Sequence, residues 1–220
     1  NLKTKVSKNG KLITEGYDIS IQNGKLNFET SQSGSYAIEF KGVSKKIVIK
    51  EIPKPIEFIG AWTVSFTAGW GAPETVVFNK LISWSENADN GIKYYSGTAR
   101  YINELKVTKK MLGENSKLTL DLGEVRDLAE IIVNGKSLGV IWKPPFRIDV
   151  TSVLKVGKNK LEIKVTNVWV NRLIGDEVEG GKRYLNPITR NHYDEPSEQK
   201  LFPSGLLGPV QLKTSIKEEF

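Results

Sequence analysis

The sequence predicts an all-β protein, in which a β-sandwich is preceded by a small β domain. Three observations support this class. Apolar and polar residues alternate in one segment after another, which is typical of strands with one face in a core. Asn-Gly pairs recur between such segments and favour type I′ hairpin turns, because both turn residues need positive φ. Patterns with helical periodicity are nearly absent.

The individual elements follow from this alternation. We expect strands in the segments 35–40, 45–52, 117–122, 129–133, 146–150 and 160–165. We expect tight turns at Asn9-Gly10, Asn23-Gly24 and Asn134-Gly135. One short helical turn could follow residue 149, because Asp149 and Thr151 are both suitable N-cap residues.

A domain boundary is expected in residues 51–57, which read EIPKPIE. Two prolines in four residues cannot pair normally in a sheet and hold the chain extended. We therefore divide the chain into a small all-β domain, residues 1–53, and a larger sandwich, residues 54–220. The first of these could be an immunoglobulin-like sandwich truncated at its N-terminal side.

Composition excludes several classes of site. The absence of cysteine excludes disulfides and thiolate metal sites, and the one histidine, His192, excludes mechanisms that need two. Much of the net charge of +7 lies in residues 1–55, which carry 10 Lys and 5 Asp+Glu residues. These lysines are scattered and lack the arginine and stacking aromatics of a nucleic-acid surface. We expect solvated strand faces and blunted sheet edges, and no nucleic-acid partner.

Neither a leader nor a membrane span is evident. The chain begins at Asn1, has no basic-then-apolar leader and contains no apolar run of about 18 residues. We expect no membrane insertion, and we expect the chain to be an excised piece of a longer protein.

Polar groups gather in residues 165–177, VTNVWVNRLIGDE, interpreted as the end of a buried strand. Asn171, Arg172 and Asp176, with Trp169 on the same strand end, could grip a sugar through hydrogen bonds and ring contact. They could equally close the sandwich, because arginine pairs well with carboxylates. A third interpretation places them at a seam with another domain.

Two further candidates lie in loops. Trp70, in the glycine-rich segment TAGWGAPET, is a candidate stacking platform for a sugar, or packs beneath its loop or against a domain that this chain lacks. Asn87 and Asp89, in NADNG, partly resemble a calcium loop without its closing glutamate. A plain Asn-Gly turn explains that segment as well, so structural calcium is a minor expectation and no other cofactor is expected.

Catalytic residues are not expected in this chain. A glycosidase needs two carboxyl groups about 5–10 Å apart across a pocket. Asp176 with Glu177, or Asp194 with Glu195, could be considered, but adjacent acids in a polar loop are usually solvated. Residues 176–203 are expected to form a long loop, and such loops are often functional.

From residue 57 onward the sequence resembles the C-terminal region of glycoside hydrolase family 106, the α-L-rhamnosidase-like enzymes. The resemblance rests on IGAWTVSF, KLISWSENADNGIKYYSGTARY, LDLGEVRDLAEIIVNGKSLGVIWKPPFRIDVT, GKNKLEIKVTNVWVNRLIGDE and LFPSGLLGPVQL, in that order. The blocks YSGTARY, LDLG, VNGKSLG, NKLEIKVTN and PSGLLGPV also resemble the sugar-binding jelly roll of glycoside hydrolase family 2, a galactose-binding-like sandwich.

The resemblance implies that residues 54–220 form a galactose-binding-like jelly roll. It implies a secreted or periplasmic parent, a carbohydrate hydrolase whose catalytic carboxylates lie in an upstream barrel. The chain would then be an accessory region whose partner is that upstream catalytic domain. The alternative is an independent carbohydrate-binding module that holds a polysaccharide through Trp70 and the 176–203 loop.

Overall fold

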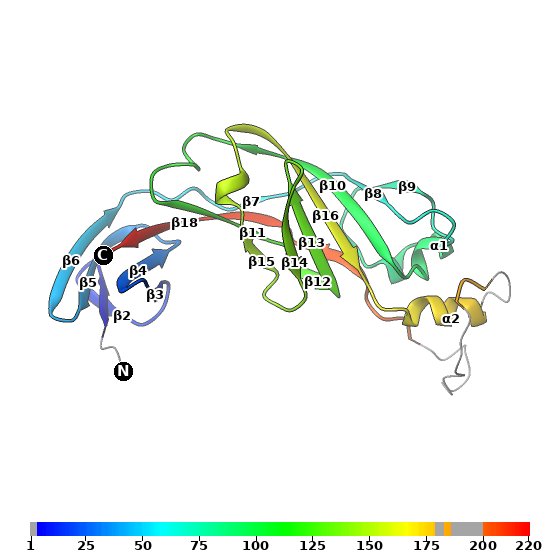
Figure 1. The fold of residues 1–220 in the computed structure, drawn as a ribbon, viewed down its shortest axis with the longest axis horizontal. Coiled ribbons are helices and arrows are strands. Elements are labelled where there is room, and N and C mark those ends of the chain that lie inside the picture. Colours follow the sequence, from blue (N-terminus) through cyan, green and yellow to red (C-terminus); the bar gives the residue numbers. More distant parts are fainter. Residues whose placement is uncertain (1–3, 179–182, 186–199) are drawn as a thin grey trace.

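The computed structural model describes residues 4–178, 183–185 and 200–220, and most of their regular structure is β. Figure 1 shows an arch with the N-terminal strands at one end, the long strands of the larger sandwich in the middle and helix α2 at the other end. The predicted fold class is confirmed, because the strands form layered antiparallel sheets of a galactose-binding-like sandwich.

The N-terminal lobe opposes two layers of strands. One layer has the order β2-β1-β5-β6. Its strands are β1 (Lys5–Lys8), β2 (Lys11–Ile13), β5 (Gly34–Phe40) and β6 (Val43–Ile49). The other layer contains β3 (Asp18–Gln22) and β4 (Lys25–Thr30). Alternation places Leu26 and Phe28 in the core of this lobe, where Tyr36 and Ile38 of the facing strand meet them.

The larger sandwich has one six-stranded sheet, in the order β14-β13-β16-β10-β8-β9. Its strands are β8 (Trp62–Ser65), β9 (Thr75–Phe78), β10 (Thr98–Val107), β13 (Leu128–Val133), β14 (Lys136–Ile141) and β16 (Gly157–Thr166). A short ribbon pairs β12 (Glu124–Arg126) with β17 (Gly205–Gly208). The core of this sandwich is rich in aromatic rings, including Trp62, Trp84 and Tyr101.

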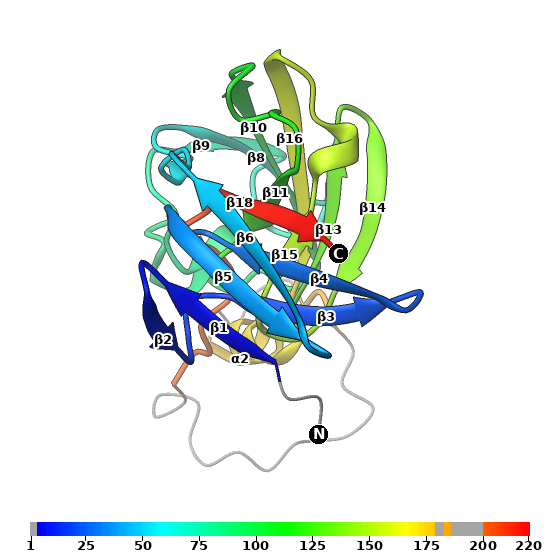
Figure 2. The same cartoon turned by 90° about the vertical axis from the view of Figure 1, so that its left-hand side faces the viewer.

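The second large sheet is shared by both lobes. It has the order β15-β11-β18-β4-β3, with β7 (Ile56–Glu57) also paired to β18. Here β11 is Ser116–Asp121, β15 is Arg147–Asp149 and β18 is Gln211–Glu219. The first half of β18 pairs with β11, and its second half pairs with β4. Figure 2 shows the end of β18 beside β4 of the N-terminal lobe.

Strand β18, from the end of the chain, contributes to the lobe that the expected division at residues 53 and 54 assigns to the first 53 residues. The hydrophobic cores of the two lobes are separate clusters, but Ile216 and Phe220 pack against the N-terminal core. Backbone bonds join Leu26 and Phe220 in both directions, at 3.0 and 2.8 Å. The division remains a prediction, and the last strand of the chain crosses it.

The predicted strands and turns are found where the alternation indicates. All six expected segments overlap strands, namely β5, β6, β11, β13, β15 and β16. Asn134 and Gly135 both have positive φ, 51° and 83°, as a type I′ hairpin turn requires.

Helical structure is short. It comprises α1 (Asn90–Lys93), α2 (Val170–Val178) and the 3₁₀ turns η1 (Trp84–Glu86) and η2 (Thr151–Val153). In the described part of the chain, no helix has the length and apolar character needed to cross a membrane.

Candidate functional site

Helix α2 carries most of the polar side chains that the sequence singles out. The prediction of a strand end there is wrong, because residues 170–178 are helical. In the helix, Arg172 and Asp176 lie four residues apart and so share one face. That face is buried, and Ile174 and Gly175 are buried beside it.

Arg172 is almost fully buried, and its charged group contacts a carboxylate and two aromatic rings. Its Nε donates to Asp176 Oδ1 at 2.9 Å, and only 1% of its side chain is exposed. Its guanidinium lies between two aromatic rings, 5.7 Å from the centroid of Tyr94 and 4.9 Å from that of Tyr184. The ring faces and the carboxylate together offset the loss of hydration that burial of a guanidinium costs.

Asp176 connects this helix to a later segment. Its second oxygen, Oδ2, accepts the backbone N–H groups of Tyr184 at 3.0 Å and Leu185 at 2.9 Å. The carboxylate thus accepts one arginine donor and two backbone donors, and such charge-assisted hydrogen bonds are short and strong. The Asp176 side chain therefore fixes residues 183–185 against α2.

Asn171 performs a similar task for the segment before β17. Its amide donates to the Phe202 carbonyl at 2.8 Å and accepts the Phe202 N–H at 2.9 Å. Like Arg172 and Asp176, it is almost fully buried. The polar atoms of all three side chains thus bond within the chain, as the interpretation of a closed sandwich end expects, and a sugar contact by these residues stays a prediction.

The residues next to this buried cluster are exposed and apolar. Val168, Trp169 and Phe202 have 52%, 67% and 57% of their surface exposed, and we call them the aromatic end. Val168, Phe202 and Asn171 are among the residues that line a small pocket of about 80 Å³. The expectation that Trp169 and Asn171 lie together on one strand end is wrong, because Trp169 precedes the helix and is exposed while Asn171 lies in the helix and is buried.

Trp70 lies at the same end of the molecule. It is half-buried and packs against the core of the larger sandwich. A Cβ atom on the neighbouring Gly71 would stand 3.2 Å from the Tyr184 ring, which itself covers Arg172. The structure therefore brings the Trp70 loop and the α2 cluster together. The binding-module alternative also relies on the 176–203 loop. Residues 179–182 and 186–199 of that loop, including His192, Asp194 and Glu195, lie outside the described residues.

Asn87 and Asp89 hold a turn. Asp89 is the N-cap of α1 and accepts the Ile92 N–H at 3.2 Å, while Asn87 accepts the Asp89 N–H at 2.9 Å. Over residues 4–178, 183–185 and 200–220, no group of three or more His, Cys, Asp or Glu is placed to hold a metal ion.

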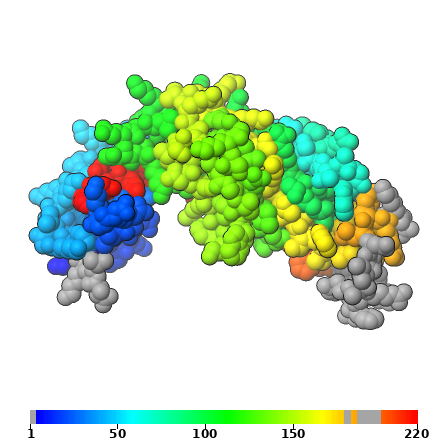
Figure 3. Space-filling model, in the orientation of Figure 1, coloured from blue at the N-terminus to red at the C-terminus, as the bar shows by residue number. Residues whose placement is uncertain are grey.

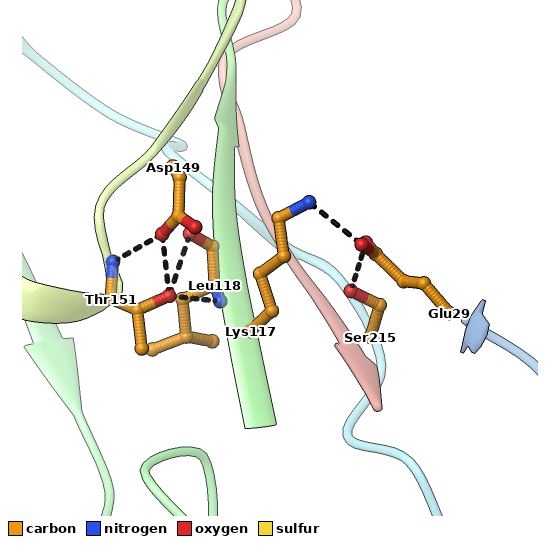
Figure 4. A network of polar contacts seen from close by, with 6 residues as sticks. All are labelled: Glu29, Lys117, Leu118, Asp149, Thr151 and Ser215. Carbon is orange, nitrogen blue, oxygen red and sulfur yellow. Dashed lines mark hydrogen bonds and ion pairs between the residues drawn. The ribbon is translucent and has the colours of Figure 1, made fainter. Parts of the chain in front are cut away.

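A second polar site, which the sequence did not reveal, lies in the hollow between the lobes. It is a groove of about 650 Å³ on the outer face of the shared sheet, and Figure 3 shows the hollow between the N-terminal lobe and the centre of the arch. Lys117 Nζ and Ser215 Oγ each donate to the Glu29 carboxylate at 2.7 Å (Figure 4). These three residues come from β11, β18 and β4, so the contact joins the lobes.

The opposite side of this groove is built in the same way. Arg147 and Lys213 each donate to Asp121 Oδ2 at 2.7 Å. Burial would raise the pKa of the Asp121 carboxyl, but Lys213, the Gly123 N–H and Arg147 together bring that pKa below its usual range. Asp121 therefore stays ionised at neutral pH and is unsuited to act as a general acid.

Comparison with known proteins agrees with this architecture. The family described as glycosyl hydrolase 2 galactose-binding domain-like matches residues 79–196, more than half of the chain. A putative beta-glucuronidase of Formosa agariphila is 40% identical over 225 residues, an alignment that covers 91% of this chain and 19% of that protein. The chain thus spans about a fifth of the length of this curated relative.

One solved structure resembles almost the whole chain. It is a rhamnosidase from Novosphingobium sp. PP1Y, with a TM-score of 0.68 and 28% sequence identity. The similarity covers 96% of this chain and 25% of the rhamnosidase. Both lobes and the shared sheet therefore have a counterpart within a larger protein.

Proposed function

Because the chain belongs to the glycosyl hydrolase 2 galactose-binding domain-like family, we propose that it is a non-catalytic β-sandwich region of a glycoside hydrolase, which supports a catalytic domain of the same polypeptide. The observation that carries this proposal is the burial of Asn171, Arg172 and Asp176. These polar side chains of helix α2 form hydrogen bonds within the chain and are not exposed to a substrate.

The aromatic end is the surface proposed to meet the catalytic domain. Val168, Trp169 and Phe202 expose apolar surface to water. Burial of this surface against another domain would be favourable in free energy. Trp142, 70% exposed, lies at the same end of the six-stranded sheet, because Ile141 pairs with Ala129 and the adjacent Leu128 pairs with Thr166. The buried α2 cluster keeps the backbone beneath this surface rigid, which lowers the entropic cost of docking.

The length of the relatives supports a partner within the same polypeptide. About four fifths of the Formosa protein and three quarters of the rhamnosidase lie outside the part that this chain matches. We assign the parent to α-L-rhamnosidase-like enzymes of family 106, supported by the rhamnosidase similarity across both lobes. The competing assignment is a beta-glucuronidase, which is the name of the curated relative. A secreted or periplasmic location of the parent belongs to the same proposal.

The non-catalytic role is tested by assaying the 220-residue chain alone. We expect no turnover of 4-nitrophenyl α-L-rhamnopyranoside or 4-nitrophenyl β-D-glucuronide above a buffer blank. Turnover that saturates with substrate and tracks with the purified chain would contradict the proposal. The same two substrates, given to the full polypeptide that carries this region, distinguish the rhamnosidase assignment from the glucuronidase.

A further inference from the structure

We infer that the groove on the shared sheet is a binding site for a neutral oligosaccharide, separate from the aromatic end. The groove has about 650 Å³, within the range of about 300–1,000 Å³ found for small-molecule sites. Its floor is made of strands, which hold side chains more firmly than loops do. This site goes beyond the supporting role proposed above and does not depend on it.

The strand register places the floor residues on one face. Thr119 of β11 pairs with Lys213 of β18 on one side and with Asp149 of β15 on the other. Lys117, two residues before Thr119, pairs with Ser215. Because side chains alternate along a strand, these residues all point away from the core that buries Leu118 and Leu120.

The charges of the groove balance and indicate an uncharged ligand. The residues that line it include three cations, Lys117, Arg147 and Lys213, and three anions, Asp18, Glu29 and Asp149. Lys117 is bonded to Glu29, while Arg147 and Lys213 are bonded to Asp121. An anion would therefore have to displace Glu29 or Asp121 from its cations, whereas sugar hydroxyl groups can donate to Asp18 and Asp149, which form no ion pair within the described residues.

Several polar atoms remain for such hydroxyls. Asp149 uses Oδ1 to hold the N–H and hydroxyl of Thr151, at 2.9 and 2.6 Å (Figure 4), which leaves Oδ2 available. Within the described residues, the Thr119 hydroxyl and the Asp18 carboxylate have no hydrogen-bond partner. Tyr17 lines the N-terminal wall and supplies an aromatic ring for the C–H groups of a sugar.

The test is calorimetric titration of the 220-residue chain with cellotetraose, xylotetraose, mannotetraose and galactotetraose, with tetragalacturonate as the anionic comparison. We expect at least one neutral tetrasaccharide to bind with millimolar or lower Kd. Thr119→Val and Asp18→Asn should each weaken that binding at least fivefold. Thr63→Val, which removes an exposed hydroxyl from the outer face of the other sheet, should change it less than twofold.

Three results would overturn the inference. The first is silence of the whole neutral panel. The second is tighter binding of tetragalacturonate than of any neutral sugar. The third is binding that survives Thr119→Val and Asp18→Asn but is lost in Trp169→Ser, which would place the ligand at the aromatic end. Near-ultraviolet circular dichroism of each variant separates loss of binding from loss of folding.

Discussion

Arg172 and Asp176 lie one turn apart on α2 and are bonded at 2.9 Å, with 1% and 5% of their side chains exposed. The pair closes one end of the sandwich from inside, because the Asp176 carboxylate also binds residues 184 and 185. The side chains that the sequence suggests for gripping a sugar are therefore bonded within the chain, beneath the aromatic end, and a sugar contact by them stays a prediction.

Breaking the buried pair should destabilise the protein strongly. Arg172→Met leaves the Asp176 carboxylate buried without its cation, so we expect a loss of about 3 kcal/mol in the free energy of unfolding. The double variant Arg172→Met/Asp176→Leu should lose less than the two single changes added together, since it removes both charges. Urea unfolding followed by tryptophan fluorescence measures both.

A matched control is the exposed pair of Lys158 and Glu104, at 2.9 Å with 77% and 55% of the side chains exposed. Water screens that pair, so Lys158→Met should leave the unfolding midpoint unchanged. Equal effects of Arg172→Met and Lys158→Met would show that the α2 pair is not the support described.

Gly205 should not tolerate a side chain. Its φ is +94°, and a Cβ atom there would stand 2.5 Å from the Trp84 ring, which donates its indole N–H to the Tyr101 hydroxyl. We expect Gly205→Ala to cost at least ~3 kcal/mol through backbone strain and overpacking. Gly135→Ala is the control, because Gly135 has a similar φ of +83° but open space around it. It should cost only the strain, about 1–2 kcal/mol.

Asp121 should make stability depend on acid pH. Its pKa is lower in the folded state than its unfolded value of about 3.9, so its contribution is present above that value. The contribution is lost as pH falls through the folded pKa. Asp121→Asn should therefore be less stable than the wild type at pH 7, by about 1 kcal/mol after solvent screening.

Thermal unfolding from pH 7 down to pH 2.5 checks this sign, with the gap between Asp121→Asn and the wild type narrowing below pH 4. Gly135→Ala, which changes no ionisable group, should show no such narrowing. A gap for Asp121→Asn that widens in acid would mean that the carboxyl is not stabilised in its ionised form.

The last five residues should stabilise the N-terminal lobe. Residues 216–220 pair with β4, and Ile216 and Phe220 cover the core around Leu26 and Phe28. Deleting them should raise hydrogen exchange in residues 25–40 while leaving the β10–β16 pair protected. Exchange confined to the new C-terminus would contradict the shared strand.

Much of this fold could be predicted from local pattern. Period-two alternation predicts β5, β11 and β16, because one face of each strand meets a core. The pair Asn134-Gly135 predicts its hairpin, because both residues readily adopt the positive φ that a type I′ turn requires. Helix α2 is not predicted by this pattern, because it has only nine residues and begins just after residues 167–169, which follow β16. Its one signal was the four-residue spacing of Arg172 and Asp176, which suits a helix and not a strand.

The groove could not be predicted in the same way. Alternation places Lys117 on the solvent face of the predicted strand 117–122, but it does not identify the strands that lie beside this one, and β4 and β18 were not among the predicted strands. Ser215 is separated from Glu29 by 186 residues in the sequence, and their contact depends on β18 crossing from one lobe to the other. Only the tertiary arrangement brings these groups together.

Docking of the aromatic end onto a catalytic domain of the same polypeptide can be measured by titrating the 220-residue chain against that catalytic domain, expressed separately. We predict a micromolar or lower Kd that weakens at least tenfold in Trp169→Ser, with no change in Ile59→Ser, which removes another exposed apolar side chain. No detectable association, or equal weakening by both variants, would show that the aromatic end is not the docking surface.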